Sequence, residues 1–471
     1  MLFNSYTFII FFFTVFSFYL LLQRNLQAQN FLLLIASYIF YGWWDWRFLG
    51  LLILTSAVDF ILAGRIDAAR NPKIRKFFLT LSILLNLSVL GFFKYFNFFS
   101  YNLTRIFGMF GLKMDWFTLH IILPVGISFY TFQEMSYVID VYRRQVRPTK
   151  SFLDFALSVA FFPHLVAGPI QRSSNLIPQI TSPRVIKKGQ VYAGIFLILW
   201  GYYKKIVIAD NLGILASRIF DHYQNYQGLD LWIGTLAFCF QIYGDFSGYS
   251  DIGRGLAKLM GFDLVVNFKL PYFARNPSDF WSRWHISLST WLRDYVYIPL
   301  GGNRKGAFNT YRNLLLTMLL GGLWHGAAWN FVLWGVYHGL LLVGYHGWRQ
   351  SRPHIQSEES FIVTVAKIFT MFILVNVGWI IFRSHSLTQI LYTLSHMGVG
   401  HPSIQTVRMA YELTFFCIPL LAVQIIQARS RNLLAPLHLP RWSLAMVYSF
   451  LVIWILVYGV RESIEFIYFQ F

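Results

Sequence analysis

Charged side chains are scarce in this sequence. Asp, Glu, Lys and Arg make up 13% of its 471 residues, whereas 56% of the residues are hydrophobic. A soluble globular chain carries roughly 25% charged residues. Apolar runs close to the roughly 20 residues that cross a bilayer as a helix recur along the chain. The shortage of charge therefore excludes a soluble protein and predicts an integral membrane protein.

Cysteine and acidic residues are also few. The two cysteines, Cys239 and Cys417, lie in apolar runs without a CxxC pattern, so we expect buried hydrophobic side chains rather than a disulfide or metal ligands. The chain has 39 Lys and Arg against 20 Asp and Glu, a net charge of +19. These cations lie in short loops between apolar runs, which fits the positive-inside rule and anionic lipid headgroups. We therefore expect membrane lipid as a partner, and no nucleic acid.

A cleavable signal and an internal repeat are not evident. The run Tyr6–Leu22 has no basic n-region and no small-x-small cleavage site, which predicts a first membrane helix. The absence of a repeat disfavours transporter folds built from duplicated halves. Hydropathy predicts an all-α polytopic protein with about eleven to thirteen transmembrane or re-entrant helices. We expect one membrane domain over 1–471, with N-terminal helices at 1–140, a catalytic core at 141–350 and C-terminal helices at 351–471.

Basic loops suggest an orientation and one irregular segment. Arg24, Arg65–Lys76 and Arg143–Lys150 fall on one side when the spans are counted, which we take as the cytoplasm, with the N-terminus outside. The apolar segment Phe152–Ile170 has basic stretches at both ends and contains two prolines. Broken backbone at membrane depth is tolerated only inside protein or beside a watery cavity. We therefore expect this segment to be re-entrant or buried, with a cavity nearby.

The region Gln241–Gly339 is unusually rich in charge for a membrane sequence. Each charge at membrane depth costs a few kcal/mol or more. Either this region lies at an interface or its charges line a polar cavity; an equally open alternative is that Asp–Arg pairs hold buried loops together. The charged and imidazole residues in it are Asp245, Asp251, Arg254, Arg275, Asp279, Arg283, His285, Arg293 and Asp294.

Two histidines are candidate catalytic residues. His325 lies in GGLWHGAAW, within an apolar run, and its glycine neighbours allow another backbone or a substrate to approach closely. An imidazole with a pKa near neutrality suits general-base removal of a hydroxyl proton, although a histidine bonded across helices is the alternative. His285, in WSRWHISLS, is its natural companion. A zinc site is not expected, because the two histidines lack i, i+4 spacing and no further Cys/His cluster completes the ligands.

Long motifs carry a family resemblance from about Tyr41 to about Arg383. The chain resembles the membrane-bound O-acyltransferase (MBOAT) family, in its alginate O-acetylation (AlgI-like) branch. The matching motifs are PVGISFYTFQ, YVIDVYR, FFPHLVAGPIQR, DFSGYSDIGRG, FWSRWHISLSTWLRDYVYIPLGG and GGLWHGAAWNFVLWG. One departure is Glu134, where the branch more often has a small polar residue.

The resemblance implies a many-helix fold with re-entrant segments, enclosing a tunnel across a bacterial inner membrane. It matches His325 to the family's active histidine and His285 to its second, more variable polar position. It implies acetyl-CoA or an acyl carrier as a cytoplasmic donor, with no bound cofactor. In this branch the acyl group passes to an extracytoplasmic SGNH-type acetyltransferase that decorates a polysaccharide.

These observations predict a mechanism. His325 would deprotonate a hydroxyl that attacks an acetyl thioester, and His285 would position the donor or stabilise the oxyanion. A covalent acyl-imidazole on His325 is a further alternative. Four cations, Arg275, Arg283, Arg304 and Lys305, would hold CoA phosphates or, with equal weight, anchor the chain to lipid. Further donor-binding or tunnel-lining candidates are Arg283, Asp245, Asp251, Arg293, Asp294 and Trp324.

Two other functions stay open from the sequence. A related MBOAT branch transfers D-alanine from a carrier protein to teichoic acid. A transporter or polysaccharide flippase would use the buried charges to line a translocation path, and its transport would survive substitution of His325.

Overall fold

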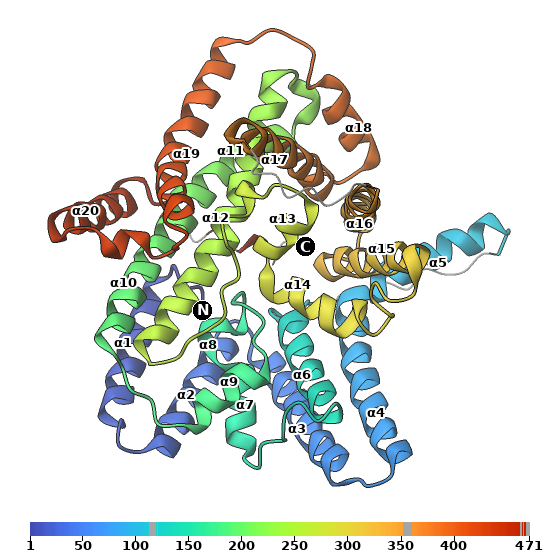
Figure 1. Cartoon of the computed structure of the whole chain (residues 1–471), viewed down its shortest axis with the longest axis vertical. Coiled ribbons are helices and arrows are strands. Elements are labelled where there is room, and N and C mark those ends of the chain that lie inside the picture. Colours follow the sequence, from blue (N-terminus) through green and yellow to red (C-terminus); the bar gives the residue numbers. More distant parts are fainter. Residues whose placement is uncertain (113–118, 120, 352–359, 462–463, 465, 468–471) are drawn as a thin grey trace. The chain divides into compact units, whose positions relative to one another are not determined.

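The computed structural model of the chain describes residues 1–112, 119, 121–351, 360–461, 464 and 466–467. Every regular element in these residues is a helix, from α1 (Tyr6–Leu21) to α20 (Arg441–Tyr458), as Figure 1 shows. The all-α prediction is confirmed. Six helical stretches are long and apolar enough to cross a membrane: Trp46–Ala68, Pro72–Met109, Lys188–Phe220, Phe361–Arg383, Ile404–Ser430 and Arg441–Tyr458.

The chain forms two compact units. The first contains Met1–Val191 and Leu256–Val265. Several of its helices begin after residues that cap helix N-termini: Asn25, Asp45 and Asn71 each accept a hydrogen bond from a backbone N–H in the first turn. The hydropathy of the run Phe117–Val138 predicts a further span. This run begins outside the described residues, and the helix described in that region starts at Ile127. The helices are α1, α2 (Leu26–Gly42), α3 (Trp46–Ala68), α4 (Pro72–Leu90), α5 (Phe96–Met109), α6 (Ile127–Tyr142), α7 (Phe152–Ala160), α8 (Phe162–Leu165) and α9 (Ser173–Thr181).

The irregular segment predicted at Phe152–Ile170 is broken and buried within this first unit. It divides into the short helices α7 and α8, and every residue from Phe155 to Gln171 is buried. Its backbone groups find partners inside the protein: the Phe162 N–H donates to Ser37 Oγ at 3.0 Å. The prediction of a buried, interrupted segment is confirmed, because protein groups replace the hydrogen bonds that a continuous helix would make.

Two acidic side chains are buried among α3, α4 and α6 of the first unit. Asp59 accepts hydrogen bonds from Ser82 Oγ at 2.5 Å and Asn86 Nδ2 at 2.7 Å. Glu134 accepts one from Ser56 Oγ at 2.7 Å. Both carboxyl groups are 0% exposed, so hydroxyl and amide donors take the place of water around them.

The second unit contains Tyr192–Gly255 and Val266–Phe471. Both cysteines predicted to be buried are buried here. The seven-residue π-helix Tyr203–Ala209 joins α10 to α11. The helices of this unit are α10 (Lys188–Tyr202), α11 (Asp210–Phe220), α12 (Leu229–Leu259), α13 (Pro277–Arg283), α14 (Ile286–Leu292), α15 (Gly306–His325), α16 (Trp329–Gln350), α17 (Phe361–Arg383), α18 (Leu387–His396), α19 (Ile404–Ser430) and α20; α10 and α12 also extend into the first unit.

Glycines bring α15 and α16 into close contact. A Cβ added at Gly322 would lie 2.2 Å from Phe331 O and 3.1 Å from the Gly335 Cα. A Cβ at Gly335 would in turn lie 2.5 Å from Met318 O. Small residues at such positions let membrane helices approach closely enough to pack backbone on backbone. The sequence left open whether the glycines near His325 admit another backbone or a substrate. The structure shows that the backbone of α16 approaches at Gly322.

Candidate active site

His325 ends α15 within an aromatic enclosure. The side chain is 3% exposed, and Gly326 follows it in extended backbone. The imidazole meets the ring of Trp334 edge-on at 4.9 Å between centroids and that of Phe382 at 5.4 Å. Trp334 comes from α16 and Phe382 from the end of α17, so three helices fix the position of this ring. Aromatic walls of this kind lower the local dielectric and strengthen every polar interaction inside them.

His285 lies immediately before α14, in a left-handed backbone conformation (φ 42°, ψ 54°). This region costs a non-glycine residue roughly 1–2 kcal/mol, so the surrounding structure must hold it there. The side chain is 0% exposed, and Nδ1 lies 3.1 Å from Asn267 Oδ1. His285 is outside the six candidate spans, and burial lowers its pKa to about 3. The imidazole is therefore neutral at physiological pH.

Trp324 connects the two histidines. Its ring lies 5.6 Å from that of His285 and 5.2 Å from that of His325, both in edge-to-face contact. Phe246 of α12 packs on the other side of His285 at 4.6 Å. The structure thus brings three of the predicted site residues, His285, His325 and Trp324, into one buried cluster.

Asp245 belongs to a buried ion-pair cluster beside this site. Its Oδ1 lies 2.9 Å from Lys205 Nζ, which also lies 2.7 Å from Asp210. The Ile467 N–H donates to Asp245 Oδ2 at 2.7 Å. The neighbouring Phe466 ring packs on Phe246 at 5.6 Å, and Phe246 in turn contacts His285. Asp245 therefore anchors a late segment of the chain close to the histidines.

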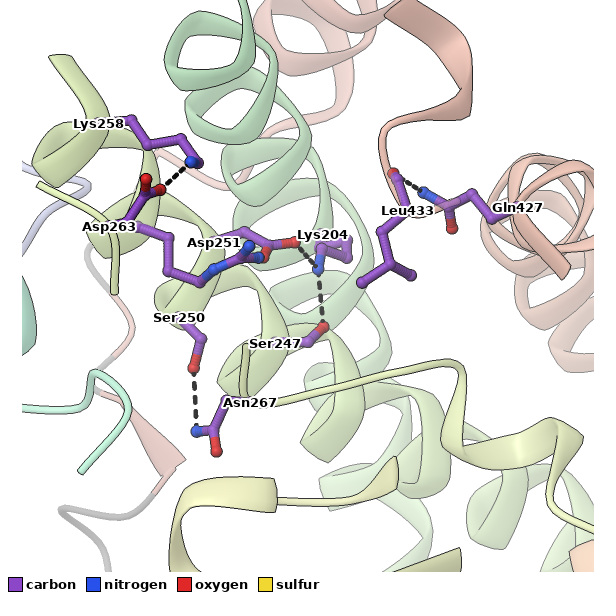
Figure 2. A network of polar contacts seen from close by, with 10 residues as sticks. Lys204, Ser247, Ser250, Asp251, Lys258, Asp263, Asn267, Gln427 and Leu433 are labelled. Carbon is purple, nitrogen blue, oxygen red and sulfur yellow. Dashed lines mark hydrogen bonds and ion pairs between the residues drawn. The ribbon is translucent and has the colours of Figure 1, made fainter. Parts of the chain in front are cut away.

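Asp251 lies in a second ion-pair cluster one turn and a half further along α12. It accepts from Lys204 Nζ at 2.7 Å, and Lys204 also donates to Ser247 at 3.0 Å, as Figure 2 shows. Asp251 also accepts from Arg254 at 3.0 Å. Lys204 is 2% exposed. A lysine this deeply buried is tolerated because a carboxylate neutralises it.

The other predicted charged residues lie near His285 in the chain but are paired with their neighbours. Arg283, on the last turn of α13, bonds Asp279 at 2.6 Å. Arg293 bonds Asp294 at 2.6 Å in the π-helix that follows α14. Three further cations predicted for donor phosphates, Arg275, Arg304 and Lys305, are exposed. These pairs match the structural alternative that the sequence left open, and a role in donor binding stays a prediction.

Comparison with known proteins identifies the family. The model of the membrane-bound O-acyltransferase family matches residues 75–388. The chain belongs to the MBOAT family. It is therefore a membrane protein and an O-acyltransferase.

Several relatives of this MBOAT protein are known in bacteria. It is 45% identical over 390 residues to the probable alginate O-acetylase AlgI of Pseudomonas putida. The aligned residues cover 82% of this chain and 78% of that protein. It is 35% identical over 449 residues to the peptidoglycan O-acetyltransferase of Helicobacter pylori, and the alignment covers 88% of this chain and 83% of that protein. The teichoic acid D-alanyltransferase of Streptococcus thermophilus is more distant, at 29% identity over 248 residues, and the alignment covers 50% of this chain and 60% of that protein.

The structure of this MBOAT chain also shows site residues that the sequence did not reveal. They are Asn267, Phe246, Lys204, Lys205, Trp334 and Phe382. The adjacent lysines in YYKKIVIAD carried a signal, because two cations in an apolar run require carboxylate partners. Asn267 carried none, since an asparagine in a loop is ordinary until its neighbours are known. Among the described residues, no group of three His, Cys, Asp or Glu side chains is arranged to hold a metal ion.

Proposed function

We propose that this MBOAT protein transfers acetyl groups from a cytoplasmic thioester donor toward an extracytoplasmic polysaccharide similar to alginate. One observation carries the proposal: two buried histidines share the ring of Trp324 in a chain that is 45% identical to alginate O-acetylases. A membrane protein that only packs helices has no need for two enclosed imidazoles on the ends of separate helices.

The reaction joins a hydroxyl to the acetyl carbonyl. The hydroxyl oxygen forms the new C–O bond, the C–S bond breaks, and the hydroxyl proton passes through an imidazole to the leaving sulfur. A neutral histidine can accept that proton, and proton transfer by a positioned side chain contributes typically about 10²–10⁴-fold in rate. His325 and His285 are the catalytic residues of this proposal, with His325 the base expected from the sequence.

The donor that we propose is acetyl-CoA, used as a substrate rather than held as a cofactor. Its phosphates carry negative charge, and Arg275, Arg304 and Lys305 provide exposed cations in the same unit as the histidines. Guanidinium and ammonium groups bind phosphate through charge-assisted hydrogen bonds. The pair Arg293–Asp294 has an exposed arginine, which can exchange partners at little cost.

The acceptor and location follow from the relatives. The relatives are named for alginate and for peptidoglycan, and they are bacterial proteins, so we propose a polymer of this kind as the acceptor and the inner membrane of a bacterium as the location. An SGNH-type acetyltransferase on the outer face is the partner that we expect to receive the acetyl group. The basic loops Arg65–Lys76 and Arg143–Lys150 support a cytoplasmic side for donor entry.

The test is acetyl transfer from radiolabelled acetyl-CoA in membranes, with and without the extracytoplasmic partner. We expect label to reach the partner or the polymer with the wild type and to be lost with His325→Ala. His401→Ala is the matched control, because it removes an exposed imidazole that lies in a loop before α19. Equal labelling by His325→Ala and the wild type would remove His325 from the chemistry.

D-alanyl transfer to teichoic acid is the second candidate, favoured by the 29% identity to a teichoic acid D-alanyltransferase. It predicts that acetyl-CoA labels nothing and that a D-alanyl carrier protein replaces it as the donor. Identity to the acetyltransferases is higher and covers more of the chain, which supports acetyl transfer as our first candidate.

A further inference from the structure

A groove runs along α20 in the second unit. Its volume is about 350 Å³, and pockets that bind small molecules measure about 300–1,000 Å³. The walls come from three helices, α10, α19 and α20, and the turn Ala435–His438 between α19 and α20 contributes Pro436. The lining consists almost wholly of hydrocarbon and aromatic side chains. Six of them are Phe196, Trp200, Val423, Ile426, Met446 and Val447.

The groove exists because α20 packs on the protein mainly through its second half. Trp454 stacks on Phe415 of α19 at 4.9 Å, and Phe450 contacts Tyr203 of the π-helix at 5.9 Å. Of the 18 residues of α20, all of which the structure describes, Leu451 alone is buried. The helix lies at the edge of its unit, as Figure 1 shows. The first half of α20 therefore stands apart from α10 and α19, and the groove lies between them.

Arginines gather where α19 ends and α20 begins. Arg429, Arg431 and Arg441 are exposed, and Arg429 and Arg441 lie less than one helical turn from lining side chains. The sequence contains no Asp or Glu from Leu413 to Val460. Guanidinium groups bind phosphate through charge-assisted, often bidentate hydrogen bonds. This end of the groove therefore attracts an anion, while the rest of the groove favours hydrocarbon.

The groove has about the depth of one membrane leaflet. Its lining follows α20 from Ser443 to Leu451, a rise of about 12 Å at about 1.5 Å per residue. One leaflet contributes about half of the roughly 30 Å hydrocarbon thickness of a bilayer. Trp442 is 86% exposed beside Arg441, as expected of a tryptophan at the membrane–water interface. Ser443 carries the one hydroxyl group of the lining and lies at this same end, so the polar and apolar parts follow the order of a phospholipid headgroup and chain.

We propose that this groove binds one anionic glycerophospholipid, with an acyl chain between α10, α19 and α20 and the phosphate on Arg429, Arg431 and Arg441. Anionic headgroups are recognised by clusters of basic residues next to membrane-spanning helices. A second copy of this chain fits less well, because its net charge of +19 would bring like charge to the arginines. The groove shares no lining residue with the histidine cluster, and the inference does not depend on acyl transfer.

The test is native mass spectrometry of the full chain in a neutral detergent. The protein is titrated with phosphatidylglycerol, which is anionic, or with phosphatidylcholine of identical acyl chains, which has no net charge. We expect the tightest site of the wild type to prefer phosphatidylglycerol by about tenfold or more. Arg429→Gln and Arg441→Gln should each weaken phosphatidylglycerol binding about fivefold and leave phosphatidylcholine binding unchanged, because one basic side chain near a membrane surface contributes about this factor.

Matched variants separate the groove from the rest of the surface. Val447→Trp fills the groove, whereas Val457→Trp places the same ring on an exposed position of α20 outside it. Arg408→Gln removes an exposed arginine at the opposite end of α19. We expect Val447→Trp to abolish the tight site for both lipids, and both controls to bind as the wild type does. Folding is checked by gel filtration; if Val447→Trp does not fold, the arginine variants, which change exposed side chains, still decide the matter.

Three results would overturn the inference. Equal affinity of the wild type for the two lipids would indicate general contact with the bilayer, and unchanged phosphatidylglycerol binding by the arginine variants would remove the headgroup site. A lipid-free dimer that Val447→Trp dissociates would show that a second copy fills the groove. Because the measurement is lipid binding and not acetyl transfer, any of these results leaves the proposed function standing, and a wild type that transfers no acetyl group leaves this inference standing.

Discussion

Gly322 on α15 offers a sharp test of how helix packing supports the active site. It lies three residues before His325, where α15 and α16 touch backbone to backbone. The added methyl group of Gly322→Ala would lie 2.2 Å from Phe331 O. Ordinary van der Waals contact needs about 1 Å more, and the atom in the way is backbone, so the two helices must separate locally.

The size of the effect follows from this displacement. Extra methylene groups in a well-packed interior typically cost about 1–3 kcal/mol. A misplacement of about 1 Å in a catalytic group costs about 10²-fold in rate. Because α15 carries His325 at its end, we expect Gly322→Ala to lower both the thermal stability and the kcat of acetyl transfer.

Two other glycines provide graded controls for the same measurement. A Cβ at Gly321 would lie 3.1 Å from a flexible Leu292 methyl group, so Gly321→Ala should be mild. A Cβ at Gly344 on α16 meets nothing within 4 Å. Gly344→Ala should keep activity and gain about 0.5–1 kcal/mol from better helix propensity.

The assay is the melting midpoint of purified protein in detergent, followed by gel filtration, together with acetyl transfer per folded molecule. The expected order of both stability and rate is Gly344→Ala, then Gly321→Ala, then Gly322→Ala. A Gly322→Ala variant as stable and as fast as Gly344→Ala would refute the view that backbone contact between α15 and α16 positions His325.

Three further substitutions test other parts of the structure. Lys205→Met should cost about 3–5 kcal/mol, seen as a lower melting midpoint, because it leaves the buried Asp245 carboxylate without its cation; an unchanged midpoint contradicts this. Trp324→Leu should leave the protein folded but slow acetyl transfer about tenfold or more, since both imidazoles lose a shared wall; full activity would show that the contact is incidental. Glu134→Gln should keep wild-type stability to within about 1 kcal/mol, because burial and the interaction with Asp59 disfavour a charge at this position and the amide carries none; a large loss would show that the carboxyl group itself is required.

Much of the fold could be predicted from the sequence, because membrane-spanning helices require long apolar runs that are easy to recognise. A helix is the form in which a single segment satisfies its own backbone hydrogen bonds in lipid, so long apolar runs determine its class. The prolines of Phe152–Ile170 likewise predicted a broken segment, which the structure buries. The two-unit division was not readable, because it depends on contacts between residues far apart in the chain.

Only part of the site could be predicted from the sequence. Residue chemistry pointed to His325 and His285, and family motifs matched them to the two expected positions. The roles of the charged residues were not readable, since partner choice depends on which helices meet: Asp245 and Asp251 are neutralised by Lys205 and Lys204 from the π-helical segment.

The membrane class, the helical architecture and the two candidate histidines could be predicted before the structure was known, because hydropathy and side-chain chemistry are local properties. The contacts of Trp324 with both histidines and of Asn267 with His285 depend on the tertiary structure. Asn267 precedes His285 by 18 residues, and no local pattern specifies that contact. Hydrogen-bond direction depends on which donors surround the amide, and packing alone assembles those donors.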